Sequence, residues 1–225
     1  MNSQLLSLAI WVPILGAVPV LWIGSERRTL VRWLSLAVAL AGFVVTLPLY
    51  SGFDAAQAGM QFVEQAPWIT RFNVQYLLGV DGISMPFILL NSLITVLVVL
   101  AGWEVIEDKQ AQYMGAFLIM SGLMNGIFSA LDGVLFYVFF EASLIPMYLI
   151  IGAWGGPNRV YAAFKFFLYT LLGSLLMLVA LIWLFLESGG SFNILDWHEL
   201  RIAMAPQVLI FIAFLVSFAV KVPMW

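Results

Sequence analysis

Residues 131–152 read LDGVLFYVFFEASLIPMYLIIG, a continuous apolar run that contains one carboxylate, Glu141. At a helical rise of about 1.5 Å per residue, the run can cross a hydrocarbon core about 30 Å thick, and it places Glu141 near the midplane. An ionised carboxylate at that depth costs at least about 2.5 kcal/mol unless a partner, water or a bound proton compensates it. Pro146 has no N–H to donate to the carbonyl of Ala142, so we expect a kink beside the buried acid. The function is therefore to be sought in Glu141 and in whatever compensates it.

The composition indicates a membrane protein. Of the 225 residues, 64% are hydrophobic and 9% are charged, a balance typical of chains with several membrane spans. The chain has no cysteine, which excludes disulfides and iron–sulfur ligation by thiolates. Its one histidine, His198, excludes a bis-histidine haem and a histidine-rich metal site. The formal net charge of −3 is too small to suggest nucleic acid as a partner.

The hydropathy pattern predicts an all-α membrane protein, a polytopic helix bundle that forms a single membrane domain over residues 1–225. The first apolar run has no Lys or Arg before it and no small-residue cleavage pattern, so we interpret it as a retained span rather than a signal peptide. We expect about seven transmembrane helices, at about 3–23, 30–49, 80–103, 112–130, 132–152, 159–186 and 206–225.

The basic residues of the loops predict the orientation. One side holds most of them, and the positive-inside rule places that side in the cytoplasm, so the N-terminus and the loops 50–79 and 187–205 are outside. In loop 50–79, partial alternation around Ala66-Pro67 predicts a short hairpin on the membrane surface. The middle of loop 187–205 is interpreted as an interfacial helix. Its lipid-facing residues would be Phe192, Ile194, Leu195 and Trp197, and the cytoplasmic basic residues are Arg27, Arg28, Arg32, Lys109 and Arg159.

Two lysines lie inside predicted spans. Lys165 is about 9 Å into the sixth span, where it either snorkels to the cytoplasmic interface or takes part in an ion path. Lys221 is either an anchor near the cytoplasmic face or a lysine at the break of a discontinuous helix, because Pro223 frees the carbonyl of Ala219. Glu141 is too short to snorkel, so its structural alternative is a fixed ion pair or a permanently protonated carboxyl between helices.

Most remaining polar residues have simple structural explanations. Asp81 and Asp132 each open an apolar run, and we interpret both as N-caps that accept backbone N–H groups. His198 lies in an outside loop and is expected to face water. Helix packing accounts for the small and polar residues of the fourth and sixth spans. These are Ser121, Gly122, Asn125, Gly126, Gly173 and Ser174.

Glu141 and the two lysines are the groups that a proton path needs. A buried acid and a buried amine that meet titrate as a unit, and their separation lets the lysine release its proton onward. We therefore interpret Glu141, Lys221 and Lys165 as candidate proton-path residues.

Three segments carry a family resemblance: GVDGISMPF (79–87), FFEASLIPMYLIIGAWGGPNRVYAAFKFFLYTLLGSLLMLVA (139–180) and FAVKVPM (218–224). From about residue 70 onward, the chain resembles the antiporter-like membrane-arm subunits of bacterial proton-translocating NADH–quinone oxidoreductase, respiratory complex I. The run around Glu141 followed by GAWGGPNR favours the chain M group.

The resemblance implies a subunit of a proton-translocating NADH:quinone oxidoreductase, with its proton path at Glu141, Lys221 and Lys165. It implies that this chain binds no cofactor, since NADH, flavin, iron–sulfur clusters and quinone belong to partner subunits. The implied partners are neighbouring membrane-arm subunits, the lipid bilayer and protons. The implied location is the bacterial inner membrane, with the N-terminus on the periplasmic side.

The chain departs from the family pattern because the family continues beyond the equivalent of Trp225, with an eighth-span lysine, a twelfth-span ionisable residue and two complete inverted repeats. We therefore expect an N-terminal fragment that does not complete a path by itself. Two other functions remain open: a subunit of a multi-subunit cation/proton antiporter, and a structural scaffold whose buried charges only fix helix register.

Overall fold

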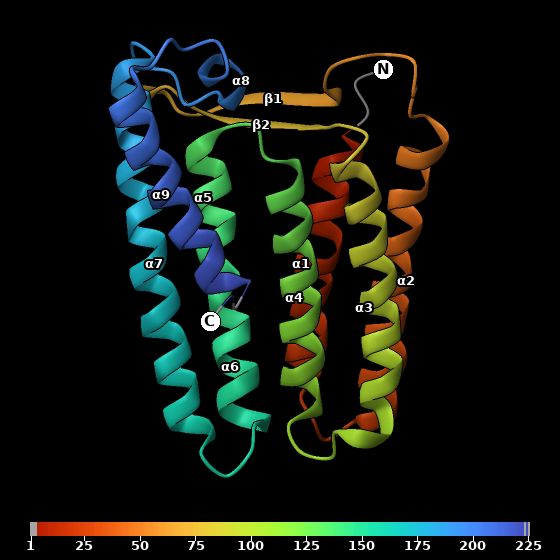
Figure 1. The fold of residues 1–225 in the computed structure, drawn as a ribbon. Helices are drawn as coiled ribbons and strands as arrows, with labels where there is room; N and C mark the ends of the chain where they lie inside the picture. The colour runs from red at the N-terminus through yellow and green to blue at the C-terminus, as the bar shows by residue number, and fades with distance from the viewer. Residues whose placement is uncertain (1–3, 223, 225) are drawn as a thin grey trace. The chain divides into compact units, whose positions relative to one another are not determined.

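Long helices dominate the described part of the chain, residues 4–222 and 224, in a computed structural model (Figure 1). Their interiors satisfy every backbone N–H within the segment, which a bilayer requires because it offers no water. The helices are α1 (Leu5–Ile23), α2 (Arg28–Ser51), α3 (Ser84–Val105), α4 (Gln110–Ser129), α5 (Gly133–Ala142), α6 (Leu144–Trp154), α7 (Arg159–Glu187), α8 (Ile194–Trp197) and α9 (Met204–Lys221). The strands are β1 (Gln61–Ile69) and β2 (Val74–Val80).

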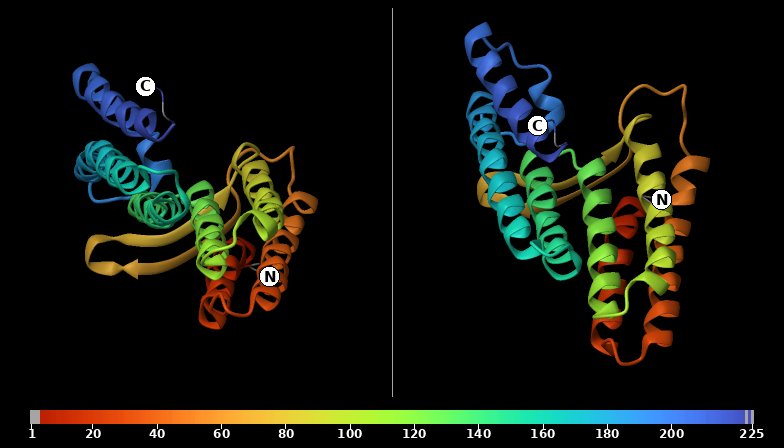
Figure 2. Two further views of the ribbon diagram at one scale, coloured as in Figure 1. Left: turned by 90° about the horizontal axis from the view of Figure 1, so that it is seen from below. Right: turned by 60° about the horizontal axis from the view of Figure 1, so that its bottom comes forward.

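The chain divides into two compact units. The first comprises Met1–Glu64 and Leu78–Ala130, and the second comprises Gln65–Leu77 and Leu131–Trp225. Helices α1 to α4 belong to the first unit, and the left view of Figure 2 looks along these four helices and shows them packed as a bundle. Helices α5 to α9 belong to the second unit.

Small and polar residues join α4 to its neighbours in the first unit. A methyl group on Gly122 would lie 2.3 Å from the carbonyl oxygen of Ile10, so only glycine permits this approach of α4 to α1. The Asn125 side chain is buried, donates to the carbonyl of Ala9 at 2.9 Å and accepts from Asn91 at 2.8 Å. The helix-packing interpretation of Gly122 and Asn125 is therefore confirmed.

The predicted hairpin of loop 50–79 is present, and its turn lies after Ala66-Pro67, the point around which the alternation was centred. Strands β1 and β2 pair with each other, and they are joined by a short 3₁₀ turn at Thr70–Phe72. Asn73 closes that turn with a φ of 54°, a left-handed conformation that asparagine tolerates better than most residues. Ala66 and Pro67 lie inside β1 instead. Proline is accepted there because β1, in a two-stranded sheet, has an open edge.

Loop 187–205 is only partly as predicted. Its helix, α8, has a single turn, and two of the four residues expected to face lipid pack on the protein instead. The Phe192 ring is buried and stacks on Phe185 with 4.2 Å between ring centroids. The indole of Trp197 donates to the carbonyl of Ser191 and lies so close to Gly133 that a side chain there would overlap it. The expectation of a lipid-facing surface was therefore wrong for Phe192 and Trp197.

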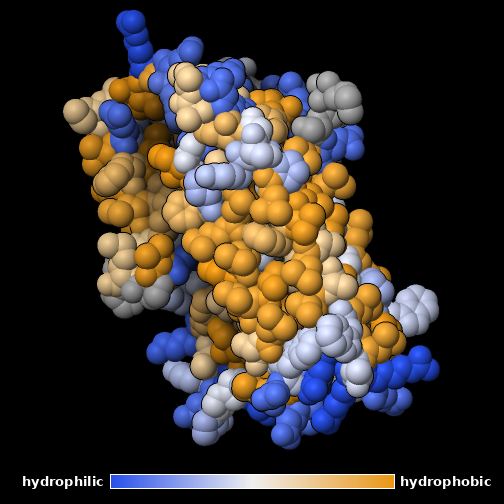
Figure 3. All heavy atoms as spheres, turned by 90° about the vertical axis from the view of Figure 1, so that its right-hand side faces the viewer, coloured by the Kyte–Doolittle hydropathy of each residue, from blue (hydrophilic) through white to orange (hydrophobic). Residues whose placement is uncertain are grey.

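Six helical stretches of the described chain are long and apolar enough to cross a membrane: α1, α2, α3, α5 with α6 as one stretch, α7 and α9. Each of the seven predicted spans contains a helix. The predicted span that does not belong to these six stretches is α4, whose polar residues Gln110, Ser121 and Asn125 are buried. One face of the molecule has a broad hydrophobic middle between hydrophilic ends (Figure 3). The chain is a multi-pass membrane protein.

Candidate functional site

The helix that carries Glu141 starts at a well-satisfied cap. Oδ1 of Asp132 accepts the N–H groups of Val134 and Leu135 at 2.9 and 3.0 Å, and Oδ2 accepts the N–H of Gln75 at 3.0 Å. The predicted cap is therefore confirmed, and it also attaches the hairpin to α5. Burial raises the pKa of Asp132, and the three N–H donors only partly offset that effect.

Glu141 is the second-to-last residue of α5 and is half-buried. Its Oε1 atom is fully buried and has no hydrogen-bond partner among the described residues. A buried acceptor without a partner costs free energy. The atom is therefore open to a donor that approaches in another state of the protein.

The expected kink lies at Ser143, where α5 ends and α6 begins. The last carbonyls of a helix have no partner within it, and Pro146 prevents the ladder from resuming at once. The Ser143 hydroxyl donates to the carbonyl of Phe140 at 2.7 Å. The junction therefore presents a backbone oxygen one residue from Glu141 and a hydroxyl oxygen two residues from it.

The Lys221 side chain reaches this junction from α9. Its Nζ donates to the carbonyl oxygen of Phe140 at 2.5 Å and to Oγ of Ser143 at 3.5 Å. The same atom lies 3.2 Å from the centroid of the Phe140 ring, a cation–π contact. Lys221 also interacts electrostatically with Glu141, but its contacts in the described chain are with Phe140 and Ser143. Two of the three predicted site residues are thus near one another without a direct ion pair.

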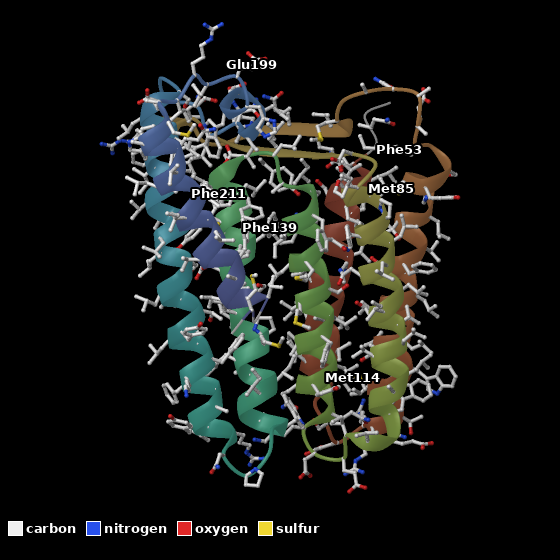
Figure 4. All side chains as sticks on the ribbon, in the orientation of Figure 1. Phe53, Met85, Met114, Phe139, Glu199 and Phe211 are labelled. Atoms are coloured by element: carbon white, nitrogen blue, oxygen red, sulfur yellow. The ribbon has the colours of Figure 1, made fainter. Side chains whose placement is uncertain are left out.

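Aromatic packing holds α9 against α5 at this point. Phe218 on α9 meets the rings of Phe136 and Phe140 edge-on, at centroid distances of 6.5 and 6.0 Å. Figure 4 labels Phe139 on α5 and Phe211 on α9, neither of which belongs to these two ring pairs. Pro223 lies outside the described residues, but the carbonyl of Ala219, which we expected to be free, accepts the N–H of Met224 at 3.0 Å.

Lys165 does not join this group. It is exposed on α7, with Nζ 5.8 Å from the centroid of the Tyr161 ring, and it lines a shallow hollow of about 440 Å³ with apolar and aromatic residues of the same helix. None of its contacts in the described chain involves Glu141 or Lys221. Its role in an ion path stays a prediction.

Our sequence interpretation missed four residues of this site. Tyr137 lies one helical turn before Glu141 and interacts electrostatically with it and with the buried Ser174 of α7. The four-residue spacing on an apolar helix was a usable signal for Tyr137. No local signal indicated Phe140, Ser143 or Ser174, because their roles arise from contacts between helices.

Other sequence candidates are structural. Oδ1 of Asp81 accepts the N–H groups of Ile83 and Ser84 at 3.1 and 2.7 Å, which confirms its capping role, and the Ser84 N–H holds its pKa below the usual value. His198 is exposed, as expected. The searched residues contain no cluster of acidic and histidine side chains that could hold a metal ion.

Two family models match adjacent parts of the chain. Residues 7–129 match the amino terminus of NADH-ubiquinone oxidoreductase chain 4. Residues 130–225 match the transmembrane segment of NADH:quinone oxidoreductases and Mrp antiporters.

Curated relatives agree with these models. The chain is 45% identical to NADH-quinone oxidoreductase subunit M of Rhodobacter capsulatus, over 99% of this chain and 46% of that protein. It is 42% identical to NADH-ubiquinone oxidoreductase chain 4 of Arabidopsis thaliana, over 97% of this chain and 44% of that protein. The chain therefore spans less than half the length of these relatives.

Solved structures show the same fold. A chain of respiratory complex I from Thermus thermophilus with bound NADH superposes with a TM-score of 0.82 and 32% identity, covering 97% of this chain and 44% of that one. A chain of the Mrp complex from Dietzia gives a TM-score of 0.80 at 20% identity, covering 96% of this chain and 23% of that one. The second likeness concerns the fold alone.

Proposed function

We propose that this chain, which belongs to the NADH-ubiquinone oxidoreductase chain 4 family, serves as part of a proton-translocating membrane-arm subunit of an NADH:quinone oxidoreductase. Its relatives of that name are matched over nearly the whole of this chain. In this proposal the oxidation of NADH by quinone takes place in partner subunits, and this chain contributes ionisable side chains to proton transfer. Its partners are neighbouring antiporter-like subunits.

The observation that carries the proposal is the open acceptor of Glu141 beside the ammonium of Lys221. One carboxylate atom of Glu141 is fully buried and unpaired, and the Lys221 ammonium is bound to the Phe140 carbonyl instead. This acid–amine pair therefore has two available arrangements. In one, the amine meets the carboxylate, and in the other it leaves, so a proton can be passed between them. A scaffold would have no need to keep an uncompensated acceptor at this depth.

We further propose Glu141, Lys221 and Lys165 as the proton-path residues. Lys165 would need a contact outside the described chain, since its own helix supplies only aromatic and apolar neighbours. We propose the bacterial inner membrane as the location, with the N-terminus on the periplasmic side. The basic residues Arg27, Arg28, Arg32, Lys109 and Arg159 support that orientation through the positive-inside rule.

The test is Glu141→Gln in the assembled, membrane-embedded oxidoreductase. Glutamine keeps the shape and removes the titratable group, so we expect assembly and NADH oxidation in uncoupled membranes to persist while proton translocation per electron falls at least tenfold. Glu199→Gln is the matched control, because Glu199 is exposed in the 187–205 loop (Figure 4). Normal translocation by Glu141→Gln would favour the scaffold, and transport that depends on sodium would favour a cation antiporter.

A further inference from the structure

We propose that Phe140 and Ser143 form a cradle that binds the Lys221 ammonium in competition with Glu141, so that Phe140 is a positioning residue for proton transfer. The inference rests on the proposed function and adds a partner for Lys221 other than the carboxylate. Three groups build the cradle: the carbonyl oxygen of Phe140, the hydroxyl of Ser143 and the face of the Phe140 ring.

The backbone makes the first part of the cradle. Because α5 ends at Ala142 and α6 begins at Leu144, the Phe140 carbonyl lies in a last helical turn, where carbonyls need a partner from outside the helix. Lys221 supplies that partner at 2.5 Å. The Ser143 hydroxyl donates to the same carbonyl and offers its lone pairs to the ammonium at 3.5 Å.

The aromatic ring makes the second part. The Phe140 side chain is buried, and its orientation is fixed by a stacked contact with Phe136 at 5.6 Å and an edge contact with Phe218 at 6.0 Å. Its negative face points to the ammonium at 3.2 Å. A cation–π contact is strongest where water is excluded, as it is between apolar helices. The ring therefore holds the charge where no carboxylate is in contact.

Competition follows from the order of residues along α5. Successive side chains of a helix project about 100° apart with a rise of about 1.5 Å, so Phe140 and Glu141 lie on adjoining sides of one turn. In this proposal the Lys221 ammonium passes from one to the other. The occupied cradle leaves Oε1 of Glu141 without a partner, as observed.

The first experiment replaces Phe140 with phenylalanines that carry one, two and three ring fluorines, in the assembled oxidoreductase. Each fluorine weakens the negative electrostatic potential of the ring face and hardly changes the shape of the side chain. The ammonium is therefore shifted stepwise toward Glu141. We expect proton translocation per electron to fall with each fluorine, about threefold to thirtyfold for the full series. Phe140→Trp keeps an aromatic face and should preserve translocation, whereas Phe140→Leu should not.

The same fluorine series at Phe139 is the matched control. Phe139 is the buried neighbour of Phe140 on α5 (Figure 4). Its fluorine series therefore measures how much translocation is lost when fluorine is placed in the core without a cation–π contact. If the two series are equal while Glu141→Gln abolishes translocation, the cradle is wrong and the proposed function stands.

The second experiment needs no activity. A cryo-electron microscopy structure of the Phe140→Leu complex should show Nζ of Lys221 at Glu141, and the Phe139→Leu complex should show it at the Phe140 carbonyl. An ammonium that stays on the carbonyl in Phe140→Leu overturns the competition. If Glu141→Gln translocates normally, the proposed function fails, and this structure still decides whether the cradle exists.

Discussion

Asp132 joins the hairpin to the helix that carries Glu141, and its replacement tests that attachment. In Asp132→Ala, helix α5 loses its cap, which costs about 1 kcal/mol. The N–H of Gln75 loses its acceptor, which costs about 1–3 kcal/mol at a buried site. The sum is about 2–4 kcal/mol. The raised pKa of Asp132 shows that burial of the charge offsets part of this gain, so we expect a loss of about 2 kcal/mol, the low end of that range.

Hydrogen exchange of the chain in lipid nanodiscs measures this loss directly. A loss of about 2 kcal/mol accelerates exchange of the Gln75 amide roughly thirtyfold. Asp132→Asn keeps an acceptor for the cap, so its effect should be distinctly smaller than that of alanine. Unchanged exchange at Gln75 in Asp132→Ala, or equal effects of Asn and Ala, would refute the reasoning.

The pH dependence provides an independent check. The folded-state pKa of Asp132 lies above the unfolded value because of burial. Its contribution is therefore fully present below the unfolded pKa of about 3.9 and is lost as the pH rises through the folded pKa. After correction for intrinsic exchange, Gln75 should lose protection from pH 4 upward. Asp132→Asn should show no such slope, and an identical slope in both proteins would mean that another group is responsible.

Three further predictions concern the first unit. Gly122→Ala places a methyl group 2.3 Å from an α1 carbonyl and should cost about 1–3 kcal/mol in detergent unfolding, whereas Gly156→Ala has open space; equal stabilities would contradict the close approach. Glu64 accepts two N–H groups of the first turn of α1 at 2.8 and 3.1 Å, so Glu64→Ala should lower its exchange protection by about 1 kcal/mol, while Glu199→Ala leaves it unchanged. Asp81 has a pKa held low by a backbone N–H, so protection at the start of α3 should be present above about pH 4 and lost as the pH falls through the folded pKa; a loss at the same pH in Asp81→Asn argues against this assignment.

The helices were predictable because their signal is local. Apolar runs interrupted by polar loops define the spans within a few residues, and the Asp132 cap follows from its place before such a run. Pro146 was enough to predict the irregularity after Glu141. Each of these features is determined by residues that are close to one another in the sequence.

The contacts of the site were not predictable in the same way. The acceptor of Lys221 is a backbone carbonyl of Phe140, and every residue has a carbonyl, so no side-chain type marks it. Phe192 has the apolar side chain of a lipid-facing residue, yet its ring stacks on Phe185 and is buried. Both outcomes depend on how helices distant in sequence meet.

The interruption at Ser143 also has a consequence for the biosynthesis of the protein. The Phe140 carbonyl oxygen, which accepts the Ser143 hydroxyl, gains a second hydrogen bond from a lysine 81 residues further along the chain. At roughly 5–20 residues per second, the ribosome needs roughly 4–16 s to reach that lysine after it has made α5. During this interval the carbonyl has the Ser143 hydroxyl as a partner and lacks the ammonium, so the cradle forms only when α9 inserts.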